Sequence, residues 1–181
     1  MKQPLIITKL QLERAARRAG CCRDFRIRIL RARSHAELLD IYIKGIRFCM
    51  HHDYPKVEYC KTHFEPTEYN SKGIYIDDNL EGKEPEHKNM IALGRCTGNL
   101  TYGDFLVRRI VCRHKAKFDI TATDYSILMV DICDEAEVSI HARDHARVVA
   151  YHYGNAQPPK TDTEGDIATI KVQHRNLIKN N

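Results

Sequence analysis

A ten-residue repeat between Arg113 and Ala156 constrains the fold more than any other feature of the chain. Set in tens, the sequence reads RHKAKFDITA, TDYSILMVDI, CDEAEVSIHA, RDHARVVAYH and the start of a fifth unit, YGNA. The fourth position is always small, the sixth and eighth are apolar, and the odd positions between them are mostly polar. Such alternation is typical of β-strands, in which neighbouring side chains point to opposite faces. The small residues are Ala116, Ser126, Ala136, Ala146 and Ala156, and the sixth-position residues are Phe118, Leu128, Val138 and Val148.

The even length of the repeat predicts a shared apolar interior, because every unit then presents side chains of the same parity to the same side. Two architectures satisfy this condition: a β-solenoid in which about two units complete one coil, and an antiparallel meander covered by helices. We favour the solenoid, because stacked coils explain why the small residue recurs at one position. The segment 103–112 fits the repeat loosely and is expected to form a cap or a first coil.

The second position of each unit predicts a tight turn. It holds Asp124, Asp134 and Asp144, with His114 and Gly154 at the ends of the series. Aspartate favours turns because its short side chain accepts hydrogen bonds from nearby backbone N–H groups.

The segment before the repeats predicts a pair of helices over 34–64. Ser34 followed by Glu37 forms a capping box that starts a helix at about 35–51. Pro55 then suits the first turn of a second helix over about 55–63. The apolar stripe of the first helix is Leu38, Leu39, Tyr42, Ile46 and Cys49.

The first 33 residues form a basic arm. They hold ten lysines and arginines against Glu13 and Asp24, a net charge of +8; the whole chain is at +5, so the remainder sums to −3. Thr8 with Gln11 and then Gly20 predict a short helix over 9–19. The alternation of Phe25-Arg26-Ile27-Arg28-Ile29 predicts a strand with its arginines outward.

These elements predict an α+β protein, a small N-terminal helical unit followed by a β-repeat unit. The expected parts are the basic arm 1–33, the helical hairpin 34–64, a polar connecting segment 65–92, the β-repeat domain 93–175 and a tail 176–181.

Composition narrows the class of protein. Hydrophobic residues make up 43% and charged residues 29%, as in an ordinary globular protein, so neither global disorder nor a membrane protein is indicated. No apolar run reaches the roughly 20 residues that span a bilayer, and the opening MKQPLIITKL is too short for a secretion signal. Seven cysteines without a regular spacing fit reduced thiols. We therefore expect a cytoplasmic protein, or a phage particle component assembled in the cytoplasm.

Sequence motifs name no reaction, catalytic residue or cofactor. The best metal candidate joins Cys49 and His51 to Cys60 and His63, two clusters that could meet if the helices fold back. Their spacing is irregular and Cys49 also belongs to the apolar stripe, so packed thiols and helix-end histidines are the favoured interpretation. Neighbouring acidic residues elsewhere in the chain lie in segments whose composition is typical of turns and loops. Carboxylates in such segments are solvated and need no catalytic role.

Two surfaces remain as candidates for binding. Odd repeat positions that should be polar hold Ile127, Met129, Val149 and Tyr151, which indicates a covering element or a protein partner. The arm could contact nucleic acid or an acidic protein through Arg14, Arg17, Arg18, Arg26, Arg28, Arg31 and Arg33. We expect a non-catalytic structural or interaction protein, with self-association or a protein partner; a nucleic-acid-binding accessory protein is the alternative, and a metal-dependent enzyme ranks third.

Three stretches carry a resemblance: LLDIYIKGIRFCMHHDYPKVEYCKTHF (38–64), GIYIDD (73–78) and residues 92–156, spread over about two thirds of the chain. They resemble an uncharacterised family from Bacteroides-type gut bacteria and their phages, in which a helical segment ending His-Asp-aromatic-Pro precedes repeats of Asp-x-Ala-x-Val-x-Val. The resemblance implies a mobile-element or phage context, and with it a virion, cargo or host-interaction role. It implies no activity, and residues 1–33 lie outside it.

Overall fold

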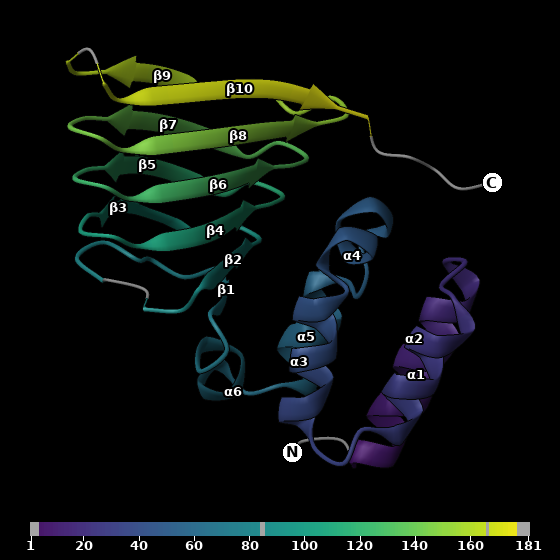
Figure 1. Cartoon of the computed structure of the whole chain (residues 1–181). Helices are drawn as coiled ribbons and strands as arrows, with labels where there is room; N and C mark the ends of the chain where they lie inside the picture. Colours follow the sequence, from purple (N-terminus) through teal and green to yellow (C-terminus); the bar gives the residue numbers. More distant parts are fainter. Residues whose placement is uncertain (1–3, 84–85, 166, 177–181) are drawn as a thin grey trace. The chain divides into compact units, whose positions relative to one another are not determined.

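The computed structural model describes residues 4–83, 86–165 and 167–176 and divides the chain into two units, one up to Lys72 and a second from Gly73 onward (Figure 1). The division falls inside the segment 65–92 that the sequence marks as a connection. Each unit is described by itself below.

The first unit is entirely helical. Its helices are α1 (Leu5–Arg18), α2 (Arg23–Arg31), α3 (His35–Lys44), α4 (Ile46–His52), α5 (Val57–His63) and α6 (Pro66–Asn70). Ser34 caps α3 as predicted, because its Oγ accepts a hydrogen bond from Glu37 N at 3.1 Å. Glu37 Oε2 accepts its bond from Arg33 N at 2.6 Å and not from Ser34 N, so the predicted capping box forms only in part. The apolar stripe from Leu38 to Cys49 is buried, although Gly45 divides the predicted helix into α3 and α4.

Two local predictions for the basic arm are wrong. Thr8 does not cap a helix, because α1 already begins at Leu5 and Thr8 lies buried inside it. Residues 25–29 are helical and belong to α2. The sequence alternates there over only five residues, and the same five place Phe25 and Ile29 one helical turn apart. Ile29 is buried, so tertiary packing selects the helical period over the strand period of two residues.

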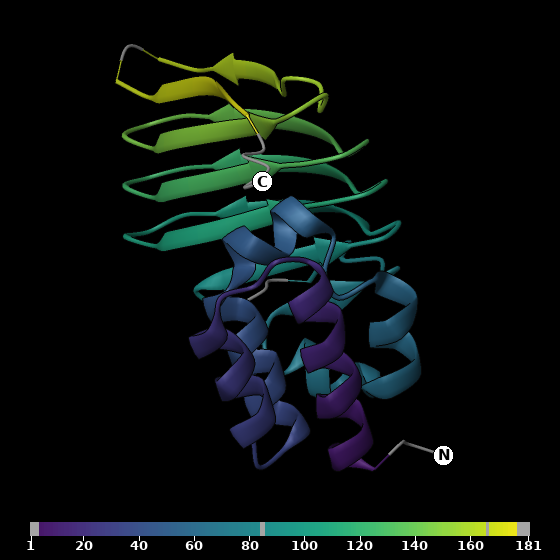
Figure 2. The same ribbon diagram turned by 90° about the vertical axis from the view of Figure 1, so that its right-hand side faces the viewer.

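The second unit is a parallel β-solenoid of about five coils, which confirms the architecture favoured from the repeat (Figures 1 and 2). Strands alternate between two sheets as the chain winds. The six-stranded sheet has the order β1 (Ile74–Ile76), β2 (Asn89–Leu93), β4 (Val107–Cys112), β6 (Ile127–Ile132), β8 (Arg147–Tyr153) and β10 (Thr169–Arg175). The four-stranded sheet has the order β3 (Thr97–Tyr102), β5 (Lys117–Ala122), β7 (Glu137–Ala142) and β9 (Lys160–Thr163).

Twenty residues, two repeat units, complete each central coil. Val107 pairs with Ile127 and Ile127 pairs with Arg147 in the six-stranded sheet, and Lys117 pairs with Glu137 in the other. The segment 103–112 is therefore a turn followed by β4, inside the stack, and the first strand is β1 in the alternating patch GIYID. The apolar interior is continuous from Leu80 to Ala168 and includes Phe118, Leu128, Val138 and Val148.

The second repeat position adopts a left-handed backbone at every turn. The φ angles are 54° at Asp104, 60° at His114, 54° at Asp124, 61° at Asp134 and 60° at Asp144, and Gly94 and Gly154 occupy the same position at the ends of the series. Glycine, asparagine and aspartate tolerate this conformation best. A conformational requirement thus explains why aspartate and glycine recur there.

Candidate interaction surfaces

Three rings stack along one turn edge of the solenoid, on the turns that lead from the four-stranded sheet into the six-stranded sheet. The ring centroids of Phe105 and Tyr125 lie 5.1 Å apart with planes 6° from parallel, and those of Tyr125 and His145 lie 4.5 Å apart at 18°. Phe105 is 79% exposed and Tyr125 51% exposed. Large aromatic side chains normally bury much of their surface, so a stacked and exposed pair marks a contact surface.

The length of the coil creates this stack. Phe105, Tyr125 and His145 follow one another at intervals of twenty residues, so each occupies the third repeat position of the same turn in successive coils. In the last coil the register shifts by one residue, since Ser139 pairs with Lys160, and Gly165 with a φ of 85° takes the left-handed position that Asp144 holds one coil earlier.

Apolar side chains widen this surface on one side. Val107, Ile127 and Met129 are 52%, 46% and 42% exposed. Val107 and Ile127 pair in the sheet, and Met129 lies two residues beyond Ile127 on the same face of β6. We call the set of Phe105, Tyr125, His145, Val107, Ile127 and Met129 the aromatic ridge.

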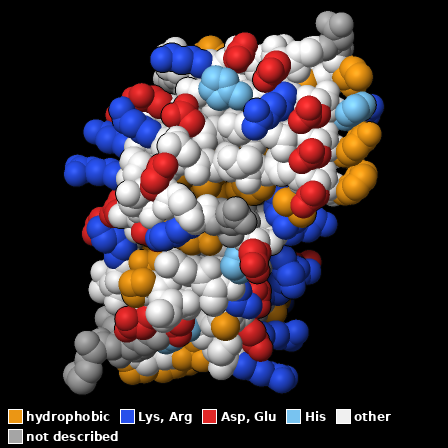
Figure 3. All heavy atoms as spheres, turned by 90° about the vertical axis from the view of Figure 1, so that its left-hand side faces the viewer, with side chains coloured by type: hydrophobic (Ala, Val, Ile, Leu, Met, Phe, Trp, Pro, Cys, Tyr) orange, Lys and Arg blue, Asp and Glu red, His pale blue; other side chains and the backbone are white. Residues whose placement is uncertain are grey.

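A column of carboxylates runs beside the ridge, and Figure 3 shows red side chains in a row next to orange and pale-blue ones along one edge of the molecule. Asp104, Asp124 and Asp144 form this column, and all three are exposed. Asp124 Oδ2 accepts a hydrogen bond from Asp104 N at 3.0 Å, and Asp144 Oδ2 accepts one from Asp124 N at 3.2 Å. The bond from Asp104 N and a second one from the Thr123 hydroxyl lower the pKa of Asp124 below its usual value. Asp124 thus remains charged while it ties its coil to the preceding one.

A shallow hollow of about 640 Å³ lies on the other sheet, and its lining mixes apolar residues such as Phe118 with charged and polar ones. Lys117 and Glu137 pair across it at 2.9 Å, and Asn99 donates to Glu81 Oε1 at 2.8 Å. The polar groups of these side chains therefore have ion-pair or hydrogen-bond partners within the solenoid. The exposed apolar surface of the solenoid is therefore concentrated at the ridge and not in this hollow.

The partner surface predicted from the sequence divides in two. Ile127 and Met129 are exposed and belong to the aromatic ridge, whereas Val149 and Tyr151 are only half exposed. The guanidinium carbon of Arg175 lies 3.4 Å from the centre of the Tyr151 ring. A cation over the ring face covers part of Tyr151 from within the same unit.

Phe105 and Tyr125 are the functional candidates that the sequence reasoning missed. In the ten-residue alignment Tyr125 and His145 alternate with Lys115 and Glu135 at the third position, which hides the aromatic column. Alignment in twenties would have placed Phe105, Tyr125 and His145 in one column.

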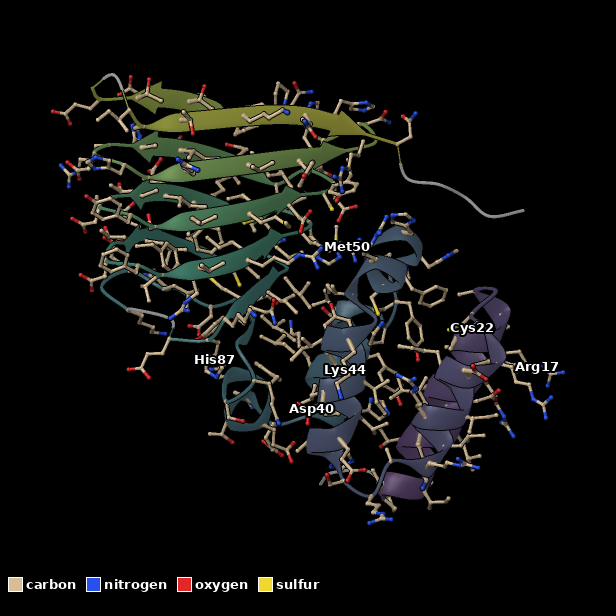
Figure 4. All side chains as sticks on the ribbon, viewed as in Figure 1. Arg17, Cys22, Asp40, Lys44, Met50 and His87 are labelled. Atoms are coloured by element: carbon tan, nitrogen blue, oxygen red, sulfur yellow. The ribbon has the colours of Figure 1, made fainter. Side chains whose placement is uncertain are left out.

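Arginines of the basic arm fall into groups with different surroundings. Arg14, Arg17 and Arg18 are exposed on α1, and Figure 4 shows Arg17 pointing away from the helices. None of the three has an ion-pair partner within the ranges that the structure describes. Arg26 instead pairs with Glu13 at 2.9 Å, and Arg33 is exposed at the end of the arm.

Arg28 and Arg31 lie beside acids of the same unit. Both line a hollow of about 410 Å³ between α2 and α3, together with Glu37 and Asp40. Their positive charge is therefore partly offset locally, and the free positive charge of the arm is concentrated on α1.

The exposed face of α1 changes character along its length. Ile6, Ile7 and Leu10 are 56%, 41% and 41% exposed near its start, and Arg14 and Arg17 continue the same face at spacings of three and four residues. The opposite face holds the buried residues Thr8, Leu12 and Ala16. An apolar patch followed by a basic patch is thus displayed on one helix.

The four predicted metal candidates do not form a cluster. Within the described ranges, no three histidine, cysteine or acidic side chains come together as a metal site would require. Cys60 is buried, which raises its pKa to about 12 and keeps the thiol protonated. His63 stacks on Tyr59 with centroids 3.8 Å apart, and its Nδ1 lies 2.8 Å from Tyr59 O. Packing explains these side chains without a ligand.

One buried carboxylate on the six-stranded sheet was not predicted. Asp131 is 1% exposed, its Oδ2 accepts from Arg109 Nε at 2.7 Å and its Oδ1 accepts from the Tyr153 hydroxyl at 2.8 Å. Burial and this carboxylate raise the pKa of Tyr153 to about 12. Because both oxygens are engaged, Asp131 holds strands β4, β6 and β8 in register.

Comparison with family models, curated proteins and solved structures finds no match to the chain. Among the described residues, no helix combines the length and the apolar character needed to cross a bilayer.

Proposed function

We propose that this is a non-catalytic interaction protein whose β-solenoid is a rigid scaffold and whose aromatic ridge is a docking surface for another protein. One observation carries the proposal: Phe105 and Tyr125 are stacked, more than half exposed, and flanked by further exposed apolar side chains. Contiguous apolar surface of this kind marks interaction sites on globular proteins.

Rigidity makes the ridge suitable for binding. The stacked rings are held by backbone turns whose aspartates bond from coil to coil, so little side-chain entropy is lost when a partner covers them. Tyrosine and phenylalanine also supply large contact area with few rotatable bonds.

The basic face of α1 supports a second role, docking on an acidic surface. Its three exposed arginines lie within five residues of one another and lack an ion-pair partner in the part of the chain that the structure describes. Such a cluster attracts a carboxylate-rich partner at long range and speeds the encounter.

Photo-crosslinking tests the docking role directly. A photoreactive phenylalanine analogue would replace Phe105 or Tyr125 in the cells that naturally make the protein, with the analogue at Asp119 on the polar sheet as control. We expect one defined adduct from either ridge position, absent from the control and lost when the other ridge ring is changed to serine. Absence of a ridge-specific adduct would count against the proposal.

Nucleic-acid binding through the arm is the second candidate, and the same unpaired arginines favour it. Arginine pairs readily with phosphate, and such binding weakens steeply with salt. Fluorescence anisotropy with a labelled non-specific DNA duplex at 50 and 200 mM salt is the test. Binding at the lower salt that is lost in Arg14→Glu/Arg17→Glu/Arg18→Glu supports this candidate, and absence of binding at the lower salt removes it.

A phage or mobile-element setting, with a virion, cargo or host-interaction role, remains part of this proposal. It depends on the sequence resemblance of residues 38–64 and 92–156 alone. Neighbouring genes for capsid, tail or regulatory proteins would support it, and a neighbourhood of unrelated housekeeping genes would argue against it.

A further inference from the structure

Two exposed apolar patches on this chain are flanked by charges of opposite sign. On α1, Ile6, Ile7 and Leu10 precede three arginines. On the solenoid, the aromatic ridge lies beside the carboxylate column. The two patches are complementary. Their apolar side chains could pack against each other, and the arginines beside one could face the carboxylates beside the other.

The charge of the turn edge is predominantly negative. Its described turn residues, 103–106, 123–126, 143–146, 164–165 and 167–168, include four carboxylates and one arginine. The carboxylates are Asp104, Asp124, Asp144 and Glu164, and the arginine is Arg143. Exposed Arg147 lies beside Ile127 on the sheet side of the ridge, so the negative charge is confined to the turn side, where it attracts the arginines of α1.

The dimensions of the two surfaces also agree. From Ile6 to Arg18, α1 extends about 18 Å at about 1.5 Å per residue. From the turn of Asp104 to the turn of Glu164 there are three coil steps, about 14 Å at the usual spacing of β-strands. A helix laid along the coil axis can therefore contact all four turns at once.

We propose that the exposed face of α1 in one copy of this protein docks on the aromatic ridge of a second copy. The inference rests on the proposed docking role of the ridge and names its partner. The two contacting surfaces differ, so the contact is heterologous: the first copy keeps its ridge free and the second keeps its α1 face free. Assembly then proceeds head to tail into a ring or an open chain.

Two complementary variants test the arrangement. The ridge variant carries Phe105→Ser and Tyr125→Ser; the helix variant carries Leu10→Ser with Arg14→Glu, Arg17→Glu and Arg18→Glu. In sedimentation velocity over a range of concentrations, we expect the wild-type protein to form oligomers that weaken with salt. Each variant alone should weaken self-association about ten-fold or more. An equimolar mixture should form a one-to-one dimer, because one variant supplies the helix and the other the ridge.

Matched controls separate docking from folding and from net charge. Lys44→Glu/Lys56→Glu/Lys61→Glu reverses three exposed charges elsewhere in the same unit, and Gln157→Ser/Lys160→Ser changes the four-stranded face of the solenoid. Both should associate like the wild-type protein, and circular dichroism should be unchanged in all variants.

Three results would overturn the inference. They are a wild-type protein that stays monomeric at all concentrations, variants that associate normally, and a mixture that remains monomeric although each variant has lost association. A ridge-specific crosslink to a different protein, with a monomeric wild type, would overturn the second-copy partner and leave the docking role of the ridge intact.

Discussion

Aspartate at the turn position serves two physical purposes in each coil. Its backbone accepts the left-handed conformation, and its carboxylate accepts a hydrogen bond from a backbone N–H of the preceding coil. Asp134 adds a third contact, because its Oδ2 also pairs with Arg113 Nη2 at 3.0 Å, and Arg113 is 2% exposed. The turn is therefore stabilised by conformation, hydrogen bonding and charge at one residue.

Substitutions at Asp134 should separate these contributions. Asp134→Ala removes both the tolerated conformation and the bonds, and we expect it to lower the free energy of unfolding by about 2–3 kcal/mol. Asp134→Gly restores the backbone freedom and should cost about 1–2 kcal/mol, and Asp134→Asn should cost least. Urea denaturation measures all three; equal costs for alanine and asparagine would contradict the explanation.

The reactivity of each cysteine depends on the burial and the pKa of its own thiol. Six of the seven cysteines are buried, and only Cys22 is exposed. Burial raises the pKa of Cys96 to about 11 and of Cys133 to about 12, so their thiolates are scarce at neutral pH.

We therefore expect a maleimide to label one thiol in the native protein and seven in urea. Intact-protein mass spectrometry counts the adducts, and peptide mapping should place the native one at Cys22. Rapid native labelling of Cys112 or Cys133, which lie in the solenoid, would contradict the burial described above.

Each strand of the solenoid has an inner and an outer face that alternate residue by residue. On β6, Leu128 is 1% exposed and packs in the interior, whereas its neighbour Ile127 is 46% exposed on the ridge. Chemically similar side chains one position apart should therefore differ widely in energetic importance.

Alanine substitution at these two neighbours is the test. Leu128→Ala should lower the free energy of unfolding by about 2–5 kcal/mol, because a cavity is left in the interior. Ile127→Ala should cost about 1 kcal/mol or less, as it removes mainly a preference for strand structure. Chemical denaturation gives both values. A larger cost at Ile127 would mean that the faces are assigned the wrong way round.

The chain as a whole divides into two compact units. The solenoid core runs from Leu80 to Ala168 and contains only residues beyond Gly73. Its parallel strands bond from coil to coil, and this arrangement is characteristic of repeat proteins, whose stability comes mostly from neighbouring units.

A fragment starting at Gly73 should consequently fold without the helical unit. We expect it to keep a β-type circular dichroism spectrum and to unfold cooperatively on heating. The corresponding fragment ending at Lys72 is the companion sample, and its spectrum should be helical. An aggregated or spectrally unfolded solenoid fragment would show that its stability depends on the helices.

The sequence by itself determined the inward side chains and the turns, because a strict repeat of even length leaves few ways to share one interior; it favoured the solenoid but left the meander open, and the strand pairing decided between them. It also determined the start of α3, a local signal carried by Ser34. Tertiary structure alone decided that residues 25–29 form a helix, since a five-residue alternation fits both periods and the burial of Ile29 selects one. It alone also brought Phe105, Tyr125 and His145 into one exposed stack, because only the winding of the coil makes residues twenty apart neighbours.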